Sequence, residues 1–190
     1  MYTYKSLVEQ VITENRATLL AVDEAEINSL IEEICQAKTI QLYAMGRMQL
    51  SVRAFAMRLK HMGFDSYVVY DTTTPCIGAG DLLIGHCAVT NVELNVITLA
   101  KQAGARVALL TAHPENEHGG YADLTVRVPG QIFGGEGEIA SIQPMSSLLE
   151  QSLFLFVDIV TMLLIEKTGI ALDEMKKRHT NLEGLPHKFA

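Results

Sequence analysis

The pattern of apolar and polar positions divides the chain into two opening helices and a longer region of alternating elements. Residues 4 to 21 and 23 to 36 each carry apolar side chains every three or four positions, a spacing typical of amphipathic helices. Asp23 is a candidate N-cap for the second helix, and Glu26 three residues later gives a capping-box-like pattern. Two helices are therefore expected before the first strand.

From residue 39 onward, short apolar runs of strand length alternate with segments of helical spacing. In residues 39 to 62 the pattern changes from strand to helix across a turn at Gly46. Parallel strands need crossovers that cover the sheet, so such alternation predicts an α/β fold with a parallel sheet and helices on both faces. We expect strands at 40–44, 67–70, 81–85, 106–111 and 124–128. We expect a helix after Gly46, where apolar side chains recur at helical spacing (Leu50, Ala54, Ala56, Met57 and Leu59), and further helices at 92–103, 146–167 and 172–177. The segments 71–80, 112–122 and 129–144 are expected to be irregular.

The longest apolar run extends from Ser152 to Ile165 and contains Asp158. It is too short and too polar in its middle to span a bilayer, so it predicts a buried helix. A helix that is apolar all round needs cover on every side, and in a small domain another subunit often provides it. We therefore expect a homo-oligomer and no membrane partner.

Composition indicates one packed domain. The chain has 190 residues, of which 48% are hydrophobic, enough for a substantial core. We expect a single domain over residues 1–190, with N-terminal helices at about 4–36 and a C-terminal tail at about 171–190. The formal net charge is −7, and the sequence has no basic stripe apart from the small cluster at residues 176–178. This charge pattern argues against nucleic-acid binding.

The three cysteines, Cys35, Cys76 and Cys87, are an odd number and lack metal-ligand spacing. This usage suits a reducing compartment better than a disulfide framework. Because no signal peptide pattern opens the sequence, we expect a cytoplasmic protein.

The turn at residues 45–49 is the first candidate binding site. Ligands of open α/β sheets settle at the carboxyl ends of strands, where helix N-termini present unpaired N–H groups to anions. Arg47 in this turn could hold a phosphate or carboxylate; alternatively, Gly46 only makes the turn and Arg47 is solvated. The Gly-x-Gly-x-x-Gly pattern of dinucleotide-binding proteins is absent, so we expect no nicotinamide cofactor.

A second candidate turn, residues 86–91, follows the third strand and precedes a helix. Thr90 or Asn91 could cap that helix, and either could also bind an anionic ligand. Cys87 near the helix start could be a nucleophile with a lowered pKa, although a small buried cysteine is the commoner case.

Glu150 and His179 are the candidate proton-transfer residues. Glu150 lies in the first turns of the long apolar helix, where burial in a cleft would raise its basicity into the range of a general base; a structural ion pair is the alternative. His179 lies in the polar tail, where it either titrates over a site or is simply solvated.

His113 and His118, with two glutamates between them, suggest a metal site. Pro114 prevents a regular helix there, and the side chains need not converge. We therefore favour a solvated loop and expect no metal.

Several short motifs extend in a fixed order over most of the chain. They are Phe-Ala-Met-Arg-Leu at 55–59, His-Met-Gly-Phe at 61–64, Thr-Thr-Thr-Pro at 72–75, Gly-Asp-Leu-Leu-Ile at 80–84, Ala-Asp-Leu at 122–124, Gln-Pro-Met-Ser-Ser-Leu-Leu-Glu-Gln at 143–151 and Arg-His-Thr-Asn-Leu-Glu at 178–183. In this order they resemble the sugar isomerase (SIS) domain family and, within it, the 6-phospho-3-hexuloisomerases. The resemblance implies a three-layer sandwich with a five-stranded, parallel, flavodoxin-like sheet, a tetramer with sites shared between subunits, and no metal. It also implies interconversion of 3-hexulose 6-phosphate and fructose 6-phosphate.

The resemblance implies that Glu150 is the base and that His179, from the same or a neighbouring chain, is the acid or ring-opening group. Its phosphate-binding turns differ here. The family's Gly-x-Gly-Arg-Ser-Gly corresponds to residues 44–49, and its Ser-Gly-Ser-Gly-Glu-Thr to residues 87–92. The three serine hydroxyls that would bind phosphate are replaced by Met48, Cys87 and Val89. An SIS-domain binding protein with a changed ligand or no catalysis is the alternative. The substrate-binding candidates are Gly46, Arg47, Met48, Thr72, Cys87, Val89, Thr90 and Asn91.

Overall fold

The computed structural model describes residues 1–87 and 91–182, without the side chains of residues 87 and 91. Its described elements are α1 (Tyr4–Leu20), α2 (Glu24–Gln36), β1 (Ile40–Ala44), α3 (Met48–Met62), β2 (Ser66–Val68), β3 (Leu82–Cys87), α4 (Asn91–Gln102), β4 (Arg106–Thr111), α5 (Glu117–Tyr121), β5 (Leu124–Arg127), α6 (Ser147–Thr168) and α7 (Leu172–Lys177). The predicted alternation of strands and helices is confirmed.

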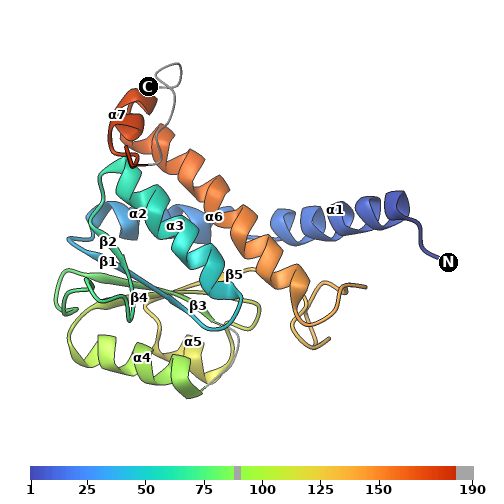
Figure 1. The fold of residues 1–190 in the computed structure, drawn as a ribbon. Coiled ribbons are helices and arrows are strands. Elements are labelled where there is room, and N and C mark those ends of the chain that lie inside the picture. The colour runs from blue at the N-terminus through green and yellow to red at the C-terminus, as the bar shows by residue number, and fades with distance from the viewer. Residues whose placement is uncertain (88–90, 183–190) are drawn as a thin grey trace.

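The five strands form one parallel sheet in the order β2-β1-β3-β4-β5. Figure 1 shows α2, α3 and α6 on one face of the sheet and α4 and α5 on the other, which gives three layers. The predicted α/β sandwich is therefore confirmed. Since α3 and α4 leave the adjacent strands β1 and β3 toward opposite faces, the chain changes direction between these two strands.

Alternating side chains along the strands fill two separate cores. In β1, Leu42 faces the larger core beneath α2, α3 and α6, whereas Tyr43 faces the smaller core beneath α4. In β3, Ile84 and Leu83 divide in the same way. All four are buried, as expected for strands covered on both faces.

Helix α6 packs against α3, α2 and α1. By length and composition alone it could cross a membrane, with a mean hydropathy of 2.0 over 18 residues, but half of that window is buried inside the fold. Asp158, midway along it, pairs with Arg58 of α3. The predicted buried helix is therefore covered on one side only within a single chain. Helix α1 packs on α6 at one end and projects away from the body at the other (Figure 1).

The apolar face expected for α3 is partly wrong. Leu50 and Met57 are 64% and 52% exposed, while Val52 and Phe55 are fully buried. The helix therefore packs on the sheet through a face that contains Val52 and Phe55, and Leu50 and Met57 lie outside that face. Leu59 is buried, as its spacing indicated.

Three further expectations need correction. The second strand ends at Val68, because Tyr70 adopts a left-handed conformation (φ 73°) that a strand does not accommodate. The loop at 112–122 contains the short helix α5, capped by Asn116. Asp23 caps α2, but Glu26 accepts a hydrogen bond from the backbone N–H of Arg127. Glu26 therefore anchors the end of β5 and does not complete a capping box.

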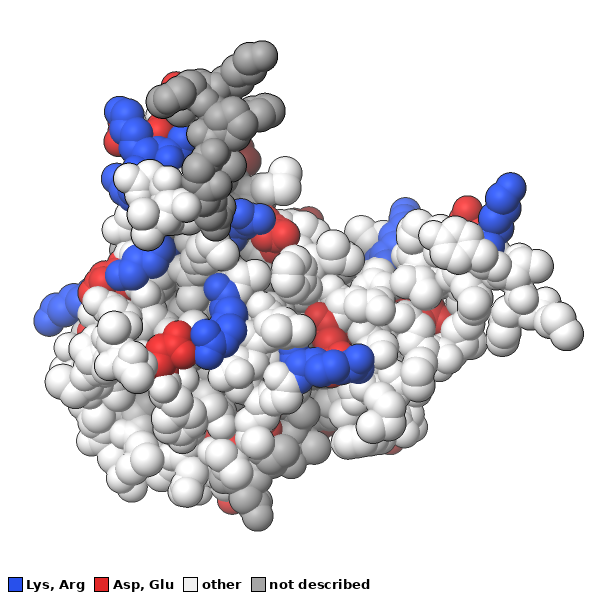
Figure 2. Space-filling model, in the orientation of Figure 1, with Lys and Arg blue, Asp and Glu red and all other residues white. Residues whose placement is uncertain are grey.

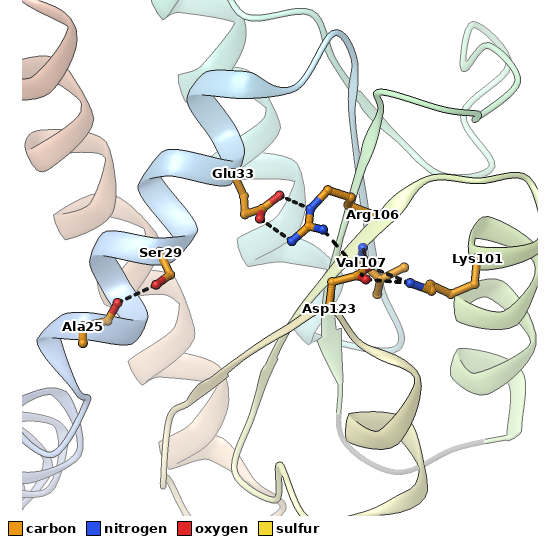
Figure 3. Close-up of polar contacts among 7 residues, drawn as sticks. All are labelled: Ala25, Ser29, Glu33, Lys101, Arg106, Val107 and Asp123. Atoms are coloured by element: carbon orange, nitrogen blue, oxygen red, sulfur yellow. Dashed lines mark hydrogen bonds and ion pairs between the residues drawn. The ribbon is translucent and has the colours of Figure 1, made fainter.

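The amino edge of the sheet carries a network of ion pairs (Figure 3). Arg106, at the start of β4, binds Glu33 of α2 through two nitrogens. Asp123, just before β5, accepts from Lys101 of α4 and from the backbone N–H of Val107. These contacts tie both helical layers to the start of the strands, so this edge has a structural role.

Candidate active site

The candidate site lies at the carboxyl edge of the sheet, between β1 and β3. Ala44, the last residue of β1, is in register with His86 near the end of β3. Because α3 and α4 diverge to opposite faces from these strands, a crevice is expected above this point, which is where open α/β sheets bind ligands. Gly46 in the first turn has φ +58°, and a Cβ added there would meet nothing within 4 Å. Its backbone is therefore open on the side a side chain would occupy.

Arg47 and Glu150 meet at this edge. The guanidinium Nη2 lies 2.6 Å from Glu150 Oε2, and Nε donates to Oε1 at 3.1 Å. Nη2 also lies within hydrogen-bond distance of the carbonyl of Met145 (3.2 Å) and the hydroxyl of Ser147 (3.3 Å). A bidentate pair of this kind fixes both side chains. The side chains remain 58% and 20% exposed, respectively, so a ligand can reach them. Glu150 therefore forms an ion pair in this structure, with its carboxylate still partly exposed.

The backbone entering α6 is strained. Met145 and Ser146 are consecutive non-glycine residues with φ 56° and 61°. Each such residue costs on the order of 1–2 kcal/mol, and such strain persists where the surroundings over-determine it, often at functional sites. Ser146 Oγ donates to the carbonyl of Ile132 at 3.0 Å, which ties this turn to the glycine-rich segment at residues 130–137.

Met48, in the place of the serine of the resembled motif, is a core residue. Its side chain is 8% exposed and belongs to the cluster between the sheet and α3. The next turn of α3 carries Ser51, whose hydroxyl donates to the carbonyl of Met48 at 2.8 Å. The Met48 side chain therefore does not line the open edge, and only its backbone N–H could face a ligand.

His86 is a buried residue that sequence reasoning placed only as the first residue of a turn. Its side chain is fully buried, Nδ1 lies 2.9 Å from Ser51 Oγ, and Nε2 has no hydrogen-bond partner among the described residues. Burial lowers the pKa of His86 to about 3, so the ring is neutral at physiological pH. The signal for its burial was its place at the end of an apolar strand.

The remaining predicted binding residues follow β2 or fall in the sequence between the end of β3 and the start of α4. Thr72 follows β2 at the same edge of the sheet and is exposed. Cys87 and Asn91 end β3 and begin α4, and their side chains are not described. Val89 and Thr90 lie outside the described residues.

His179 lies at the other end of α3. Its ring packs on His61 with centroids 5.0 Å apart, and the preceding Arg178 donates to the carbonyls of His61 (3.4 Å) and Glu174 (3.2 Å). Between Arg47 and His61 the helix rises about 20 Å, at about 1.5 Å per residue. One chain therefore brings Glu150 and Arg47 together but keeps His179 well away from them.

The loop with two histidines is more ordered than expected. His113 contacts Glu115 (2.9 Å) and Glu138 (2.8 Å), and the Glu138 carboxylate, which is nearly inaccessible, also accepts from two backbone N–H groups. The hydrogen bond to Glu138 raises the pKa of His113. His118 is buried elsewhere. Within residues 1–87 and 91–182, no group of three or more His, Cys, Asp or Glu side chains is arranged to hold a metal. The solvated-loop expectation was therefore wrong for both histidines: His118 is buried, and His113 fastens the glycine-rich segment at residues 130–137.

The fold is that of sugar isomerase domains. The sugar isomerase domain of a transcription factor from Sphaerobacter thermophilus superposes with a TM-score of 0.71 at 15% identity, covering 94% of this chain and 96% of that one. A hypothetical protein from Methanococcus jannaschii, whose structure was taken to infer a molecular function of 3-hexulose-6-phosphate isomerase, matches with a TM-score of 0.80 at 30% identity. That match covers 92% of this chain and 98% of the other.

Curated relatives with similar sequences indicate which family within this fold the chain belongs to. The 3-hexulose-6-phosphate isomerase of Bacillus subtilis is 36% identical over 179 residues, which are 93% of this chain and 97% of the relative. The enzyme of the same name from Mycobacterium gastri is 36% identical over 180 residues, covering 94% and 89%. No protein-family model matches the chain. At these identities and coverages, the chain belongs to the 3-hexulose-6-phosphate isomerase family.

Proposed function

We propose that this protein interconverts 3-hexulose 6-phosphate and fructose 6-phosphate. The reaction moves a carbonyl between C3 and C2, so a base must carry a proton between these carbons through an enediol. The observation that carries the proposal is the position of Glu150, which α6 brings to the carboxyl edge of the sheet beside Arg47. Glu150 is the base, and Arg47, the open backbone at Gly46 and the Thr72 loop contact the substrate.

Backbone groups dominate the proposed phosphate site. Met48 offers no hydroxyl, and its side chain is buried in the core. The N–H groups at the start of α3 and of the segment 87–91 are then the anion donors, with Thr90 and Asn91 as side-chain contributors. We propose that the reaction needs no metal and no organic cofactor.

We propose a homotetramer with active sites shared between subunits. His179 is the acid or ring-opening group, and because it lies at the far end of α3 from Glu150, a neighbouring subunit supplies it. The surface between α1 and α6 fits an interface: a hollow of about 750 Å³ there has mostly apolar lining residues, among them Ile12, Leu20 and Phe154. Figure 2 shows few charged side chains where α1 leaves the body. The assembly is proposed to be cytoplasmic, without membrane or nucleic-acid partners.

The second candidate is an SIS-domain protein that binds a different sugar or does not catalyse. It is favoured by the buried Met48 and by the Arg47–Glu150 ion pair, which occupies both groups in the absence of a ligand. In this case the carboxyl edge would bind a ligand without proton transfer.

The test is incubation with fructose 6-phosphate in D₂O, followed by NMR. Proton transfer through the enediol exchanges the hydrogen on C3 of fructose 6-phosphate for deuterium and forms 3-hexulose 6-phosphate. Exchange at C3 supports the isomerase, and exchange at C1 alone points to an aldose–ketose isomerase. A melting temperature raised by the sugar phosphate without any exchange favours the binding protein.

A further inference from the structure

The turn before α6 is held by a buried carboxylate of α1. Glu14 is 4% exposed, and each of its oxygens accepts two hydrogen bonds. Oε1 accepts from Gln10 Nε2 (2.9 Å) and the backbone N–H of Ile142 (3.1 Å), and Oε2 accepts from Ser141 Oγ (2.6 Å) and Gln143 Nε2 (3.0 Å). These hydrogen bonds lower the pKa of Glu14 against the raising effect of burial. The carboxylate is therefore fully used inside the fold.

The network continues into the second turn of α6. Asn15, the neighbour of Glu14, donates to Gln151 Oε1 at 2.9 Å, and its own Oδ1 accepts from Ser152 at 3.1 Å. Gln151 Nε2 donates to Gln143 Oε1 at 2.7 Å, which closes a ring of contacts. One ring thus fixes residues 141–143 and residues 151–152 on α1.

The groups that hold Arg47 lie between these two fixed segments. Met145 and Ser147 offer a carbonyl and a hydroxyl to its guanidinium, and Glu150 offers the carboxylate. The strained residues 145 and 146 need fixed neighbours on both sides to stay in their conformation. The ring around Glu14 fixes both neighbours.

We propose that Glu14 is a positioning residue for the Arg47–Glu150 pair. It acts through the 141–147 segment and touches neither residue of the pair. Its charge matters as well as its shape, because an amide in its place would turn an NH₂ group toward two donors, whichever way it is oriented. The part of the proposal that concerns catalysis rests on the proposed isomerase function; the part that concerns geometry does not.

The geometric test uses Glu14→Gln and solvent exchange of the Arg47 Nε–H proton, followed by NMR and assigned by its loss in Arg47→Lys. In the native protein this proton is held by Glu150. We expect exchange to accelerate on the order of tenfold in Glu14→Gln, because the pair opens locally. The Arg106 Nε–H, held by Glu33 at the opposite edge, is the internal reference and should not change.

Two further variants keep the result interpretable. Ser141→Ala removes the shortest of the four hydrogen bonds and should accelerate the Arg47 proton in the same direction, to a smaller extent, if Glu14→Gln does not fold. Glu33→Gln is the matched control, since it should release the Arg106 proton and leave the Arg47 proton protected. Unchanged Arg47 exchange in Glu14→Gln, or equal acceleration of both protons, would overturn the proposal.

The catalytic test measures kcat in the variants. If the native protein exchanges deuterium at C3, Glu14→Gln should lower kcat about tenfold or more while Glu33→Gln keeps it. Native kcat in Glu14→Gln contradicts the positioning role in catalysis. An inactive native protein refutes the proposed function alone, because the exchange of the Arg47 proton still decides the geometric part.

Discussion

Arg47 and Glu150 lie 103 positions apart in the chain and meet through two nitrogen–oxygen contacts at the carboxyl edge of the sheet. An anionic substrate that takes up the guanidinium would compete with this carboxylate. The pair therefore links ligand binding to the release of the proposed base.

Replacement of Arg47 by Gln should weaken sugar-phosphate binding. A hydrogen bond to a charged group contributes about 1.5–3 kcal/mol, which corresponds to a loss of affinity of roughly 10- to 100-fold. Titration calorimetry with fructose 6-phosphate measures it. Arg58→Gln is the matched control, because Arg58 also links α3 to α6, through Asp158. Equal affinities in the Arg47 variant and the native protein would remove Arg47 from the site.

Glu150→Gln should abolish isomerisation and leave the fold and oligomer intact. Loss of a general base lowers kcat by roughly 10²- to 10⁴-fold, and deuterium exchange at C3 of fructose 6-phosphate would report it. Glu166→Gln, an exposed position on the same helix, should retain activity. Unchanged turnover in Glu150→Gln would exclude this residue from the mechanism.

Met48→Ser should destabilise the fold and bring no gain in phosphate binding. The side chain is packed in the core, so its truncation leaves a cavity that costs about 2–5 kcal/mol. Chemical denaturation measures the loss. Met57→Ser, at a position 52% exposed on the same helix, should change stability little. Tighter binding of phosphate esters by the Met48 variant would show that a hydroxyl at this position does reach the ligand.

His86 should make the protein less stable as the pH falls. Its pKa is about 3 in the folded state and its ordinary value is 6.5, so below pH 6.5 the unfolded chain binds a proton that the folded protein does not. The contribution of the neutral His86 to the free energy of unfolding is fully present above pH 6.5. It is lost as the pH falls toward 3, at about 1.4 kcal/mol per pH unit.

His86→Leu should remove this dependence. Ser51 keeps its hydrogen bond to the carbonyl of Met48, and the buried Nε2, which has no hydrogen-bond partner within residues 1–87 and 91–182, disappears. Urea denaturation at pH 7, 6 and 5 gives the comparison: the difference in unfolding free energy should move in favour of the variant as the pH falls. A difference that stays constant from pH 7 to pH 5 would mean that His86 does not titrate in this way.

Ile159→Glu should dissociate the oligomer. Ile159 is 43% exposed on α6 and lies against the apolar hollow beside α1, where a charge would face a partner subunit. Light scattering coupled to gel filtration would show smaller particles. Leu99→Glu, on α4 and 62% exposed, is the control and should keep the native mass. A monomeric native protein would contradict the proposed assembly.

Most of the fold could be predicted from the sequence because local patterns determine it. Short apolar runs at strand length and Asp23 at a helix start each act within a few residues. The stripe of α3 was misjudged because Leu50 and Met57 are apolar yet exposed. Apolar spacing alone does not distinguish a side chain that faces the core from one at the surface.

The site could be predicted only in part. Position after a strand end pointed to Arg47. Position in the first turns of the long apolar helix, and then the resemblance, pointed to Glu150. Their contact, however, depends on how α6 enters the fold. Three of the four partners of Glu14, Ser141, Ile142 and Gln143, are more than 120 positions away, so no local pattern indicates them. The roles proposed for Thr72, Val89 and Thr90 stay predictions.

The length of α3 has a consequence for how the protein would work in solution. Glu150 lies near one end of this helix and His179 near the other, so a folded subunit on its own has both proposed proton-transfer residues but not in one site. The rate per subunit would then depend on protein concentration, falling upon dilution as the assembly separates. Folding alone would not make a catalyst of this chain; association would complete it.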